Sequence, residues 1–310
     1  AQFIQQKLGV KDVFMITGGG MMFLSDGVVA NPALNPVFNH HEQASAIAAF
    51  AYSKYTGNWG AAYFTTGCGS TNAITGLLDA WQDNIPVMFI SGQVKRKETT
   101  YNSGLPLRQF GVQEANIIPV VSSLTKFTVM VNEPEKIRYY LEKAAYLATV
   151  GRPGPVWLDI PLDVQGAPIN ENNLVGFDPK EIELDFKTEP TQKELADIIK
   201  LMKVAERPVI LAGHGIRIGR AIMEFRQFVE KYKIPVVATY LAIDYLPFDH
   251  PLFIGRSGLK GDRAGNLAIQ NSDLLINLGS RLGITTTGYE YELFAREAKI
   301  VVVDIDPKEH

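Results

Sequence analysis

Cysteine is nearly absent from the sequence, and long apolar runs are missing altogether. Cys68 is the one cysteine among 310 residues, which excludes an internal disulfide and a zinc site built from cysteines. No apolar stretch approaches the roughly 18 residues that span a bilayer, and no basic segment followed by an apolar one opens the sequence. These absences predict a chain with no membrane partner. The scarcity of cysteine fits a reducing compartment, for which we expect the cytoplasm.

Neither sign of charge dominates. The sequence holds 30 Lys and Arg residues against 33 Asp and Glu residues, so its formal net charge is −3. That balance provides no basic field for nucleic acid or for an anionic membrane surface. Hydrophobic residues make up 46% of the sequence and charged residues 20%, which excludes a disordered or coiled-coil chain. A length of 310 residues is too great for one comfortable core and predicts two domains of about 100–200 residues each.

Short apolar segments alternate with helical ones along both halves of the chain. This alternation predicts an α/β fold with two doubly wound parallel sheets, each covered by helices on both faces. A polar, acidic stretch at 169–190 predicts a linker between a first domain at 1–168 and a second at 191–310. Strands are expected at 13–16, 61–64, 86–90, 156–160, 208–212, 235–238, 274–278 and 300–305, and helices at 44–55, 74–81, 134–149, 192–204, 220–232 and 263–271.

Four short motifs in the first half carry groups suited to binding or catalysis. They are Gly18–Gly20, His41–Gln43, Thr65–Asn72 and Gln113–Glu114. Glycines allow the backbone to approach a ligand closely, and carboxylate, imidazole and amide side chains can hold or move a proton. We therefore take these motifs as the candidate site.

Each motif also has an ordinary structural interpretation. Three glycines can simply let a strand turn into a helix. Glu42 at a helix start is favoured by the helix dipole, and a glutamine–glutamate pair is common on a surface. The Thr65–Asn72 loop is a tight turn in which Ser70, Thr71 or Asn72 is expected to cap the following helix. Cys68 fits a small buried filler, because no paired histidine is evident in the sequence.

The order of the motifs resembles that of thiamine-diphosphate enzymes of the acetolactate synthase type. The N-terminal, pyrimidine-binding domain of that family carries a glycine-rich first turn, then H-E-Q, a T-S-G-P-G-x-T-N loop, a D-x-x-P strand and Q-E, before G-R-P-G-P-V and D-I-P. The corresponding segments here are Gly18–Gly20, His41–Gln43, Thr65–Asn72, Asp83–Pro86, Gln113–Glu114, Gly151–Val156 and Asp159–Pro161. A lone H-E-Q would mean little, whereas this ordered series covers almost the whole first half.

The resemblance implies a site for thiamine diphosphate in the first domain. Glu42 would activate the cofactor by a hydrogen bond to its pyrimidine ring, and Gln113 would lie near an oxygen of the substrate. The cofactor-binding residues implied besides Glu42 are Gly19, Gly20, Thr66, Gly67, Gly69 and Asn72. Two positions depart from the family, because Cys68 replaces a common proline and His40 replaces a common arginine.

The second half resembles the Rossmann-like middle domain of the same enzymes. The matching segments are Pro208–Gly215, Gly258–Gln270, Ser272–Leu275, Gly279–Arg281 and Val303–Pro307. The turn after the first strand reads G-x-G-x-x-x-G instead of the dinucleotide pattern G-x-G-x-x-G, and a plain strand–turn–helix junction explains it equally well. Acetolactate synthases hold FAD in this domain near arginines, here Arg256, Arg263 or Arg281. Family members without flavin make FAD the less favoured expectation.

The sequence has no G-D-G motif, with which the third domain of the family holds the diphosphate and its Mg2+. Gly261–Asp262 is followed by Arg263 and falls within the middle-domain match. No residue of this sequence is therefore expected to bind metal. We expect the chain to be the N-terminal, two-domain portion of a three-domain enzyme, inactive by itself, with the Mg2+ site in the missing domain.

For the parent enzyme, the resemblance implies a transferase or lyase of branched-chain amino acid biosynthesis. It would decarboxylate a 2-oxo acid such as pyruvate and join the product to a second carbonyl compound. Pairing through the first domain, as a homodimer or tetramer, is implied because sites in this family form between two subunits. Another thiamine-diphosphate 2-oxo acid decarboxylase, a glyoxylate carboligase or a sulfoacetaldehyde acetyltransferase stays open. So does a non-catalytic binding or assembly protein with the same folds, in which Glu42 is a relic.

Overall fold

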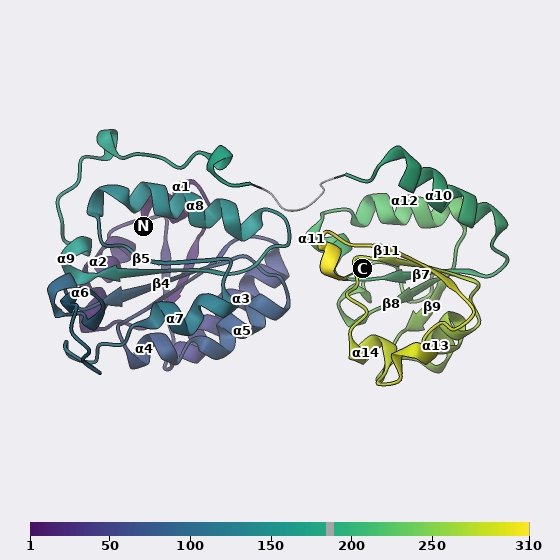
Figure 1. Cartoon of the computed structure of the whole chain (residues 1–310), viewed down its shortest axis with the longest axis horizontal. Coiled ribbons are helices and arrows are strands. Elements are labelled where there is room, and N and C mark those ends of the chain that lie inside the picture. The colour runs from purple at the N-terminus through teal and green to yellow at the C-terminus, as the bar shows by residue number, and fades with distance from the viewer. Residues whose placement is uncertain (184–188, 310) are drawn as a thin grey trace. The chain divides into compact units, whose positions relative to one another are not determined.

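The computed structural model describes residues 1–183 and 189–309, and the chain divides into two compact units, Ala1–Glu183 and Leu184–His310. Each unit is built on one sheet whose strands are all parallel, with helices between the strands (Figure 1). The expected α/β architecture with two doubly wound parallel sheets is therefore confirmed. In the described part of the chain, no helix has both the length and the apolar character needed to cross a membrane.

The first sheet has six strands in the order β2-β1-β3-β4-β6-β5. Every residue of its middle strands β3, β4 and β6 is buried. Middle strands of this kind are largely apolar because helices cover both of their faces. The strands are β1 (Asp12–Met15), β2 (Asn35–Phe38), β3 (Gly60–Phe64), β4 (Val87–Gln93), β5 (Phe127–Met130) and β6 (Val156–Pro161).

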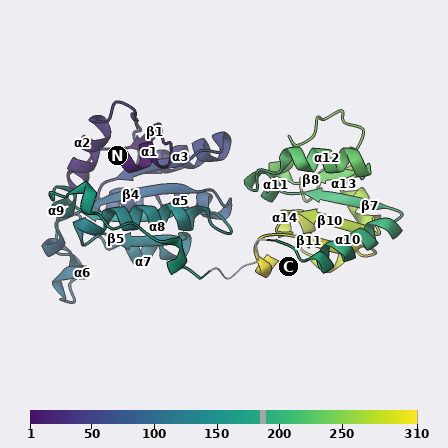
Figure 2. The ribbon, with the colours of Figure 1, turned by 90° about the horizontal axis from the view of Figure 1, so that it is seen from above.

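Helices cover both faces of the first sheet and enclose two cores, and α8 lies over the strands when this unit is seen from above (Figure 2). In the core under α3 and α5, Trp157 stacks on Phe64 and Phe89 with ring centroids 5.7 and 5.4 Å apart. One face carries α1 (Gln2–Gln6), α2 (Met22–Val29), α8 (Ile137–Thr149) and α9 (Leu162–Gln165), and the other carries α3 (Glu42–Thr56), α5 (Ile74–Gln82) and α7 (Ile117–Val121). The short helices α4 (Cys68–Thr71) and α6 (Thr100–Ser103) follow β3 and β4 in the chain.

The strand order of the first sheet reverses at β1. The chain passes from β1 to β2 on one side and then through α3 to β3 on the other side of β1. In open parallel sheets, ligands bind at the carboxyl ends of the strands where the order reverses. The segments that follow β1 and β3 here are Gly18–Gly20 and Thr65–Gly69, so two of the sequence motifs lie at the switch point.

The second sheet has five strands in the order β11-β10-β7-β8-β9, and its order reverses at β7. Its strands are β7 (Pro208–Ala212), β8 (Val236–Ala238), β9 (Phe253–Arg256), β10 (Leu274–Leu278) and β11 (Lys299–Val303). Its helices are α10 (Gln192–Val204), α11 (Gly215–Ile218), α12 (Ile222–Tyr232), α13 (Arg263–Gln270) and α14 (Ile284–Thr287).

Three strands of the structure are not predicted by the sequence pattern. β2, β5 and β9 have mixed burial along their length, and none forms a continuous apolar run. All three lie at an edge of their sheet. β4 also extends three residues beyond the expected end at Ile90, because the polar side chains of Ser91 and Gln93 are buried through hydrogen bonds.

Part of the polar stretch that was expected to be a linker folds against α8. The backbone N–H of Phe177 donates to Glu142 at 2.8 Å, and the Tyr139 hydroxyl donates to Glu181 at 2.7 Å. The ammonium group of Lys143 lies over the rings of Phe127, Tyr139 and Phe177. The stretch up to residue 183 accordingly belongs to the first unit by its contacts.

Candidate functional site

Glu42 is the first residue of α3 and follows β2 after a short loop. His41 is the N-cap of this helix, and its ring Nδ1 accepts a hydrogen bond from the Gln43 backbone N–H at 3.1 Å. Gly57 ends the helix in the left-handed conformation, which glycine adopts without steric cost. Glu42 therefore lies in the first helical turn, where the positive end of the helix dipole favours its carboxylate.

The carboxylate of Glu42 lies against the segment that follows β3. The side-chain amide of Asn72 donates to Glu42 Oε2 at 2.9 Å, and a Cβ added to Gly69 would lie 3.4 Å from Glu42 Oε1. Glu42 is half-buried, whereas Asn72 is exposed. Three residues from two separate motifs thus lie together, and one oxygen of the carboxylate faces a residue without a side chain.

The turns after β1 and β3 fit together through their glycines. The Gly20 N–H donates to the Thr65 hydroxyl at 3.1 Å. A Cβ on Gly18 would lie 2.5 Å from the Cβ of Thr65, and one on Gly20 would lie 3.1 Å from the Cβ of Thr66. A Cβ on Gly19 would meet nothing within 4 Å, and Gly19 is exposed. The backbone at Gly19 is therefore open to a ligand between two tightly packed neighbours.

Gln113 reaches the same edge of the sheet from a different part of the chain. It has a φ of +57°, and a Cβ added to Gly67 would lie 1.7 Å from the Gln113 carbonyl oxygen. Gly67 itself has a φ of +65°, so both space and backbone conformation restrict this position to glycine. The Gln113 side chain is exposed, which leaves its amide accessible beside the turn.

Glu114 supports the segment that carries Gln113. Its buried carboxylate accepts hydrogen bonds from the backbone N–H of Thr100 at 2.6 Å, from the hydroxyl of Thr100 at 2.7 Å and from the backbone N–H of Phe110 at 2.9 Å. Burial by itself raises the pKa of Glu114, but these hydrogen bonds outweigh it and hold the pKa below its ordinary value. Glu114, the second residue of the Q-E pair, therefore points into the loop and holds it together instead of pointing outward into solvent.

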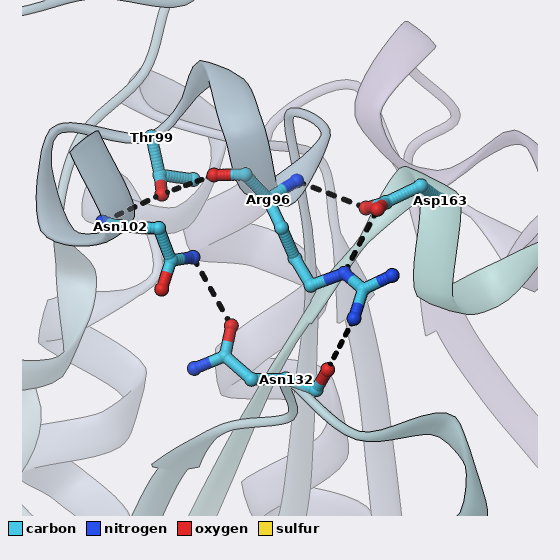
Figure 3. Close-up of polar contacts among 5 residues, drawn as sticks. All are labelled: Arg96, Thr99, Asn102, Asn132 and Asp163. Carbon is cyan, nitrogen blue, oxygen red and sulfur yellow. Dashed lines mark hydrogen bonds and ion pairs between the residues drawn. The ribbon is translucent and has the colours of Figure 1, made fainter.

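Arg96 fixes the start of that segment to α9 and to the loop after β5 (Figure 3). Its Nε and backbone N–H donate to the two oxygens of Asp163 at 2.8 and 2.9 Å, and its Nη1 donates to the Asn132 carbonyl at 2.7 Å. Asn102 donates to the Asn132 side chain at 3.1 Å, and the Thr99 hydroxyl caps α6. Burial alone raises the pKa of Asp163, but its bonds to Arg96 bring the pKa below its ordinary value.

The structure brings the whole set of sequence-derived site residues to one edge of the first sheet. The set comprises Gly19, Gly20, Glu42, Thr66, Gly67, Gly69, Asn72 and Gln113. A hydrogen bond joins Glu42 with Asn72, and the space where a side chain would stand borders Glu42 Oε1 at Gly69 and the Gln113 carbonyl at Gly67. Their roles toward a cofactor or substrate stay predictions.

Two expectations for the loop after β3 are wrong. Cys68 is exposed and is not a buried filler, because it begins the surface helix α4 directly after the left-handed turn at Gly67. Ser70 and Thr71 do not cap a helix. Their hydroxyls donate instead to backbone carbonyls of the same loop, and the N-cap residues of α4 and α5 make no side-chain capping bond.

Sequence reasoning missed a group of buried polar side chains behind the site. Asp159 accepts from Ser91 at 2.6 Å and from Gln93 at 3.1 Å, and Gln93 is in turn bonded to Thr66. Burial raises the pKa of Asp159 to about 7, although both hydrogen bonds act to lower it. The sequence did contain a signal, because Asp159 and Gln93 are polar residues inside otherwise apolar strands. Buried polar side chains of this kind need hydrogen-bond partners.

In the second unit, the turn after β7 packs against the turn after β10. The Gly215 N–H donates to the Gly279 carbonyl at 2.9 Å, and a Cβ on Gly213 would lie 2.3 Å from that same oxygen. Of the arginines associated with FAD, Arg256 is bound by Asp262 through two nitrogens at 3.1 and 3.0 Å. Among residues 1–183 and 189–309, no cluster of three His, Cys, Asp or Glu side chains could hold a metal ion.

Comparison with known proteins places both units in one family. The model for the thiamine pyrophosphate enzyme N-terminal TPP binding domain matches residues 2–117, and the model for the central domain of these enzymes matches residues 195–310. The acetolactate synthase large subunit of Lactococcus lactis is 34% identical over 98% of this chain and 51% of its own length. The corresponding subunit of Corynebacterium glutamicum is 36% identical over 98% and 47%, and a probable one of Methanocaldococcus jannaschii is 36% identical over 97% and 49%. The chain thus spans about half the length of the curated relatives it matches.

Proposed function

The chain belongs to the thiamine pyrophosphate enzymes, of which it carries the N-terminal TPP binding domain and the central domain, and from this premise we propose that it forms part of an acetolactate synthase. The proposed reaction decarboxylates a 2-oxo acid such as pyruvate and joins the remaining carbon unit to a second carbonyl compound. Relatives named acetolactate synthase, at 34–36% identity over almost the whole chain, support this substrate class.

One observation carries the proposal. The carboxylate of Glu42 lies at the switch point of the first sheet, with Oε2 bonded to Asn72 and Oε1 facing Gly69. A carboxylate placed this way has one oxygen fixed by a donor and the other beside Gly69, where the methyl group of Thr65 leaves no room for a side chain. It can hold and exchange a proton with a ring nitrogen brought against the glycine.

The residues present fit thiamine diphosphate. The backbone at Gly19 has open space where a Cβ would stand, and Gly67 and Gly69 present backbone without side chains beside Glu42 and Gln113. When bound, this cofactor supplies the nucleophilic carbon and the electron sink for loss of carbon dioxide. Glu42 would hold the proton at the cofactor's pyrimidine ring, and Gln113 would orient the oxygens of the 2-oxo acid with its exposed amide.

Further parts of the proposal concern groups and copies outside this chain. Mg2+ would accompany the diphosphate, and two copies would pair through the first unit as a homodimer or within a tetramer. FAD in the second unit is the less favoured part, because Arg256 is already committed to Asp262. A place in branched-chain amino acid biosynthesis and in the cytoplasm would follow from the proposed reaction.

Amide chemical shifts of the isotope-labelled chain test the cofactor site. Thiamine diphosphate at millimolar concentration with Mg2+ should shift the backbone amides of Gly19, Gly67 and Gly69. Glu42→Ala should abolish these shifts, because it removes the proton-holding group beside the ring. Glu135→Ala changes an exposed first-turn glutamate of the 3-10 helix Pro134–Lys136 and serves as the matched control.

Shifts confined to the second unit, or unchanged shifts in the Glu42→Ala variant, would contradict the proposed site. Turnover of pyruvate gives the second measurement, assayed on the complete synthase. It should fall by about 10²–10⁴-fold with Glu42→Ala, the range lost when a general acid–base group is removed. Undiminished turnover would leave Glu42 without the proposed role.

A further inference from the structure

Gln93 ends β4 and uses every hydrogen-bonding position of its side-chain amide. Its oxygen accepts from the Thr66 hydroxyl at 2.5 Å and from the Val94 N–H at 3.0 Å. Its nitrogen donates to the Ala115 carbonyl at 2.9 Å and to the Asp159 carboxylate at 3.1 Å. The side chain is 1% exposed, so none of these bonds is exchanged for water.

The donor and acceptor of each hydrogen bond can be assigned in order, starting from Trp157. The indole N–H of Trp157 can only donate, and it donates to Ser91 at 2.8 Å. Ser91 therefore turns its hydroxyl hydrogen to Asp159, at 2.6 Å. The second oxygen of Asp159 accepts from Gln93. The amide of Gln93 cannot flip, because a flip would bring its oxygen against the Ala115 carbonyl and its nitrogen against the Val94 N–H.

This buried amide joins two segments that are far apart in the sequence. Thr66 belongs to the turn after β3, and Ala115 directly follows the Gln113–Glu114 pair. The same two segments touch a second time at the surface, where Gly67 packs on the carbonyl of Gln113. Thr66 in turn limits the space at Gly20 in the turn after β1. A single side chain thus connects the groups that frame the candidate site.

We propose that Gln93 is a positioning residue, held in one orientation by Asp159, which keeps the Thr66 turn and the Gln113 segment in register. Gln93 itself lies beneath the turn and acts through Thr66 and Ala115. The consequence for cofactor and substrate rests on the proposed function. The joint, by which we mean the hydrogen bonds of Gln93 to Thr66 and Ala115, does not depend on that function and can be measured in the chain without any ligand.

Hydrogen exchange of the whole chain tests the joint. Gln93→Met keeps the length of the side chain and removes its hydrogen bonds, so amide exchange should rise about tenfold in both 65–69 and 113–115. Thr66→Val removes only the hydrogen bond between Thr66 and Gln93. It should raise amide exchange in 65–69, while exchange in 113–115 stays as in the unchanged protein. Ser53→Ala is the matched control, because Ser53 is another buried side chain that joins two segments, through the carbonyls of Asn58 and Pro86.

The control separates positioning from general stability. Ser53→Ala should lower the urea midpoint and leave exchange at 65–69 and 113–115 unchanged relative to the rest of the unit. If Gln93→Met raises exchange evenly across the first unit, as a general loss of stability does, the proposal is wrong. If Gln93→Met does not fold, Thr66→Val decides, and equal rises in both segments would overturn the proposal. Absence of cofactor-induced shifts would count against the proposed function and leave this joint standing.

Discussion

A carboxylic acid with no access to water lies in the middle of the first sheet. Asp159 is 0% exposed on β6, and its two hydrogen-bond donors are neutral side chains. Burial raises the pKa of Asp159 from 3.8 to about 7, so the group is still largely protonated where an unfolded aspartate is already ionised. Between these two values the unfolded state has released a proton that the folded state keeps, and stability falls as pH rises.

We expect Asp159→Asn to remove this fall. The stability advantage of the unchanged protein over the variant should be largest near pH 4.5 and should shrink by a few kcal/mol by pH 7.5, because only the unchanged protein loses stability in this window. Urea unfolding at several pH values measures it.

Asp163→Asn provides the matched control for that measurement. The pKa of Asp163 is lowered in the folded state, so its contribution is lost only as pH falls below the window. The difference between the unchanged protein and Asp163→Asn should therefore stay flat from pH 4.5 to 7.5. A difference for Asp159→Asn that is equally flat would show that Asp159 has no raised pKa.

At the scale of elements, the segment between β4 and α7 is a loop built around one carboxylate. Glu114 receives hydrogen bonds from Thr100 and Phe110, while Arg96 fixes the start of the segment to Asp163. The pKa of Glu114 is lowered from 4.5, so its ionised form stabilises the loop at neutral pH, and this contribution is lost only as pH falls well below that value.

Glu114→Gln should open this loop without unfolding the unit. An amide keeps one acceptor oxygen, but its NH2 group then faces the donors at Thr100 or the donor at Phe110, so we expect trypsin to cleave at the exposed Arg108 about tenfold faster. Timed digestion and mass spectrometry measure the rate. Glu98→Gln, in the same segment, should leave the rate at Arg108 unchanged, and equal acceleration by both variants would mean that charge alone matters.

The local pattern of the sequence is enough to place elements that carry their own signals. α10 and β10 have the bounds expected from periodicity, and α10 begins with a capping box between Thr191 and Glu194. The edge strands β2, β5 and β9 lack such signals because their residues are partly exposed. Among the candidate site residues, Glu42 and the glycines of the two turns could be identified from the order of the sequence motifs. The Gln93–Asp159 bond joins side chains 66 positions apart, which no local pattern contains.

At the scale of the whole molecule, each unit has its own sheet and its own apolar cores. The first unit also includes residues beyond its last strand, because Phe177 and Glu181 bond to side chains of α8. A unit of this kind is able to fold by itself once its own contacts are complete.

We expect residues 1–183 to fold alone and to be more stable than residues 1–168. The shorter chain loses the hydrogen bonds to Tyr139 and Glu142 and the ring of Phe177, which should cost about 1–3 kcal/mol in the free energy of unfolding. Urea unfolding of both chains measures the difference. Tyr139→Phe should weaken the longer chain and leave the shorter one unaffected, and equal stability of the two chains would place the boundary at residue 168.

The pairing of β4 with β6 has a consequence for how the protein is made. Residues that face each other in this pair, such as Met88 and Val156, are distant in the sequence, and β6 is the last strand of its sheet to leave the ribosome. Gln93 is therefore synthesised long before the carboxylate of Asp159 that orients it. Until β6 docks, the nascent chain exposes unpaired polar groups and an apolar sheet edge, which chaperones can recognise. The end of the sheet that carries the candidate site is therefore complete only once β6 is in place.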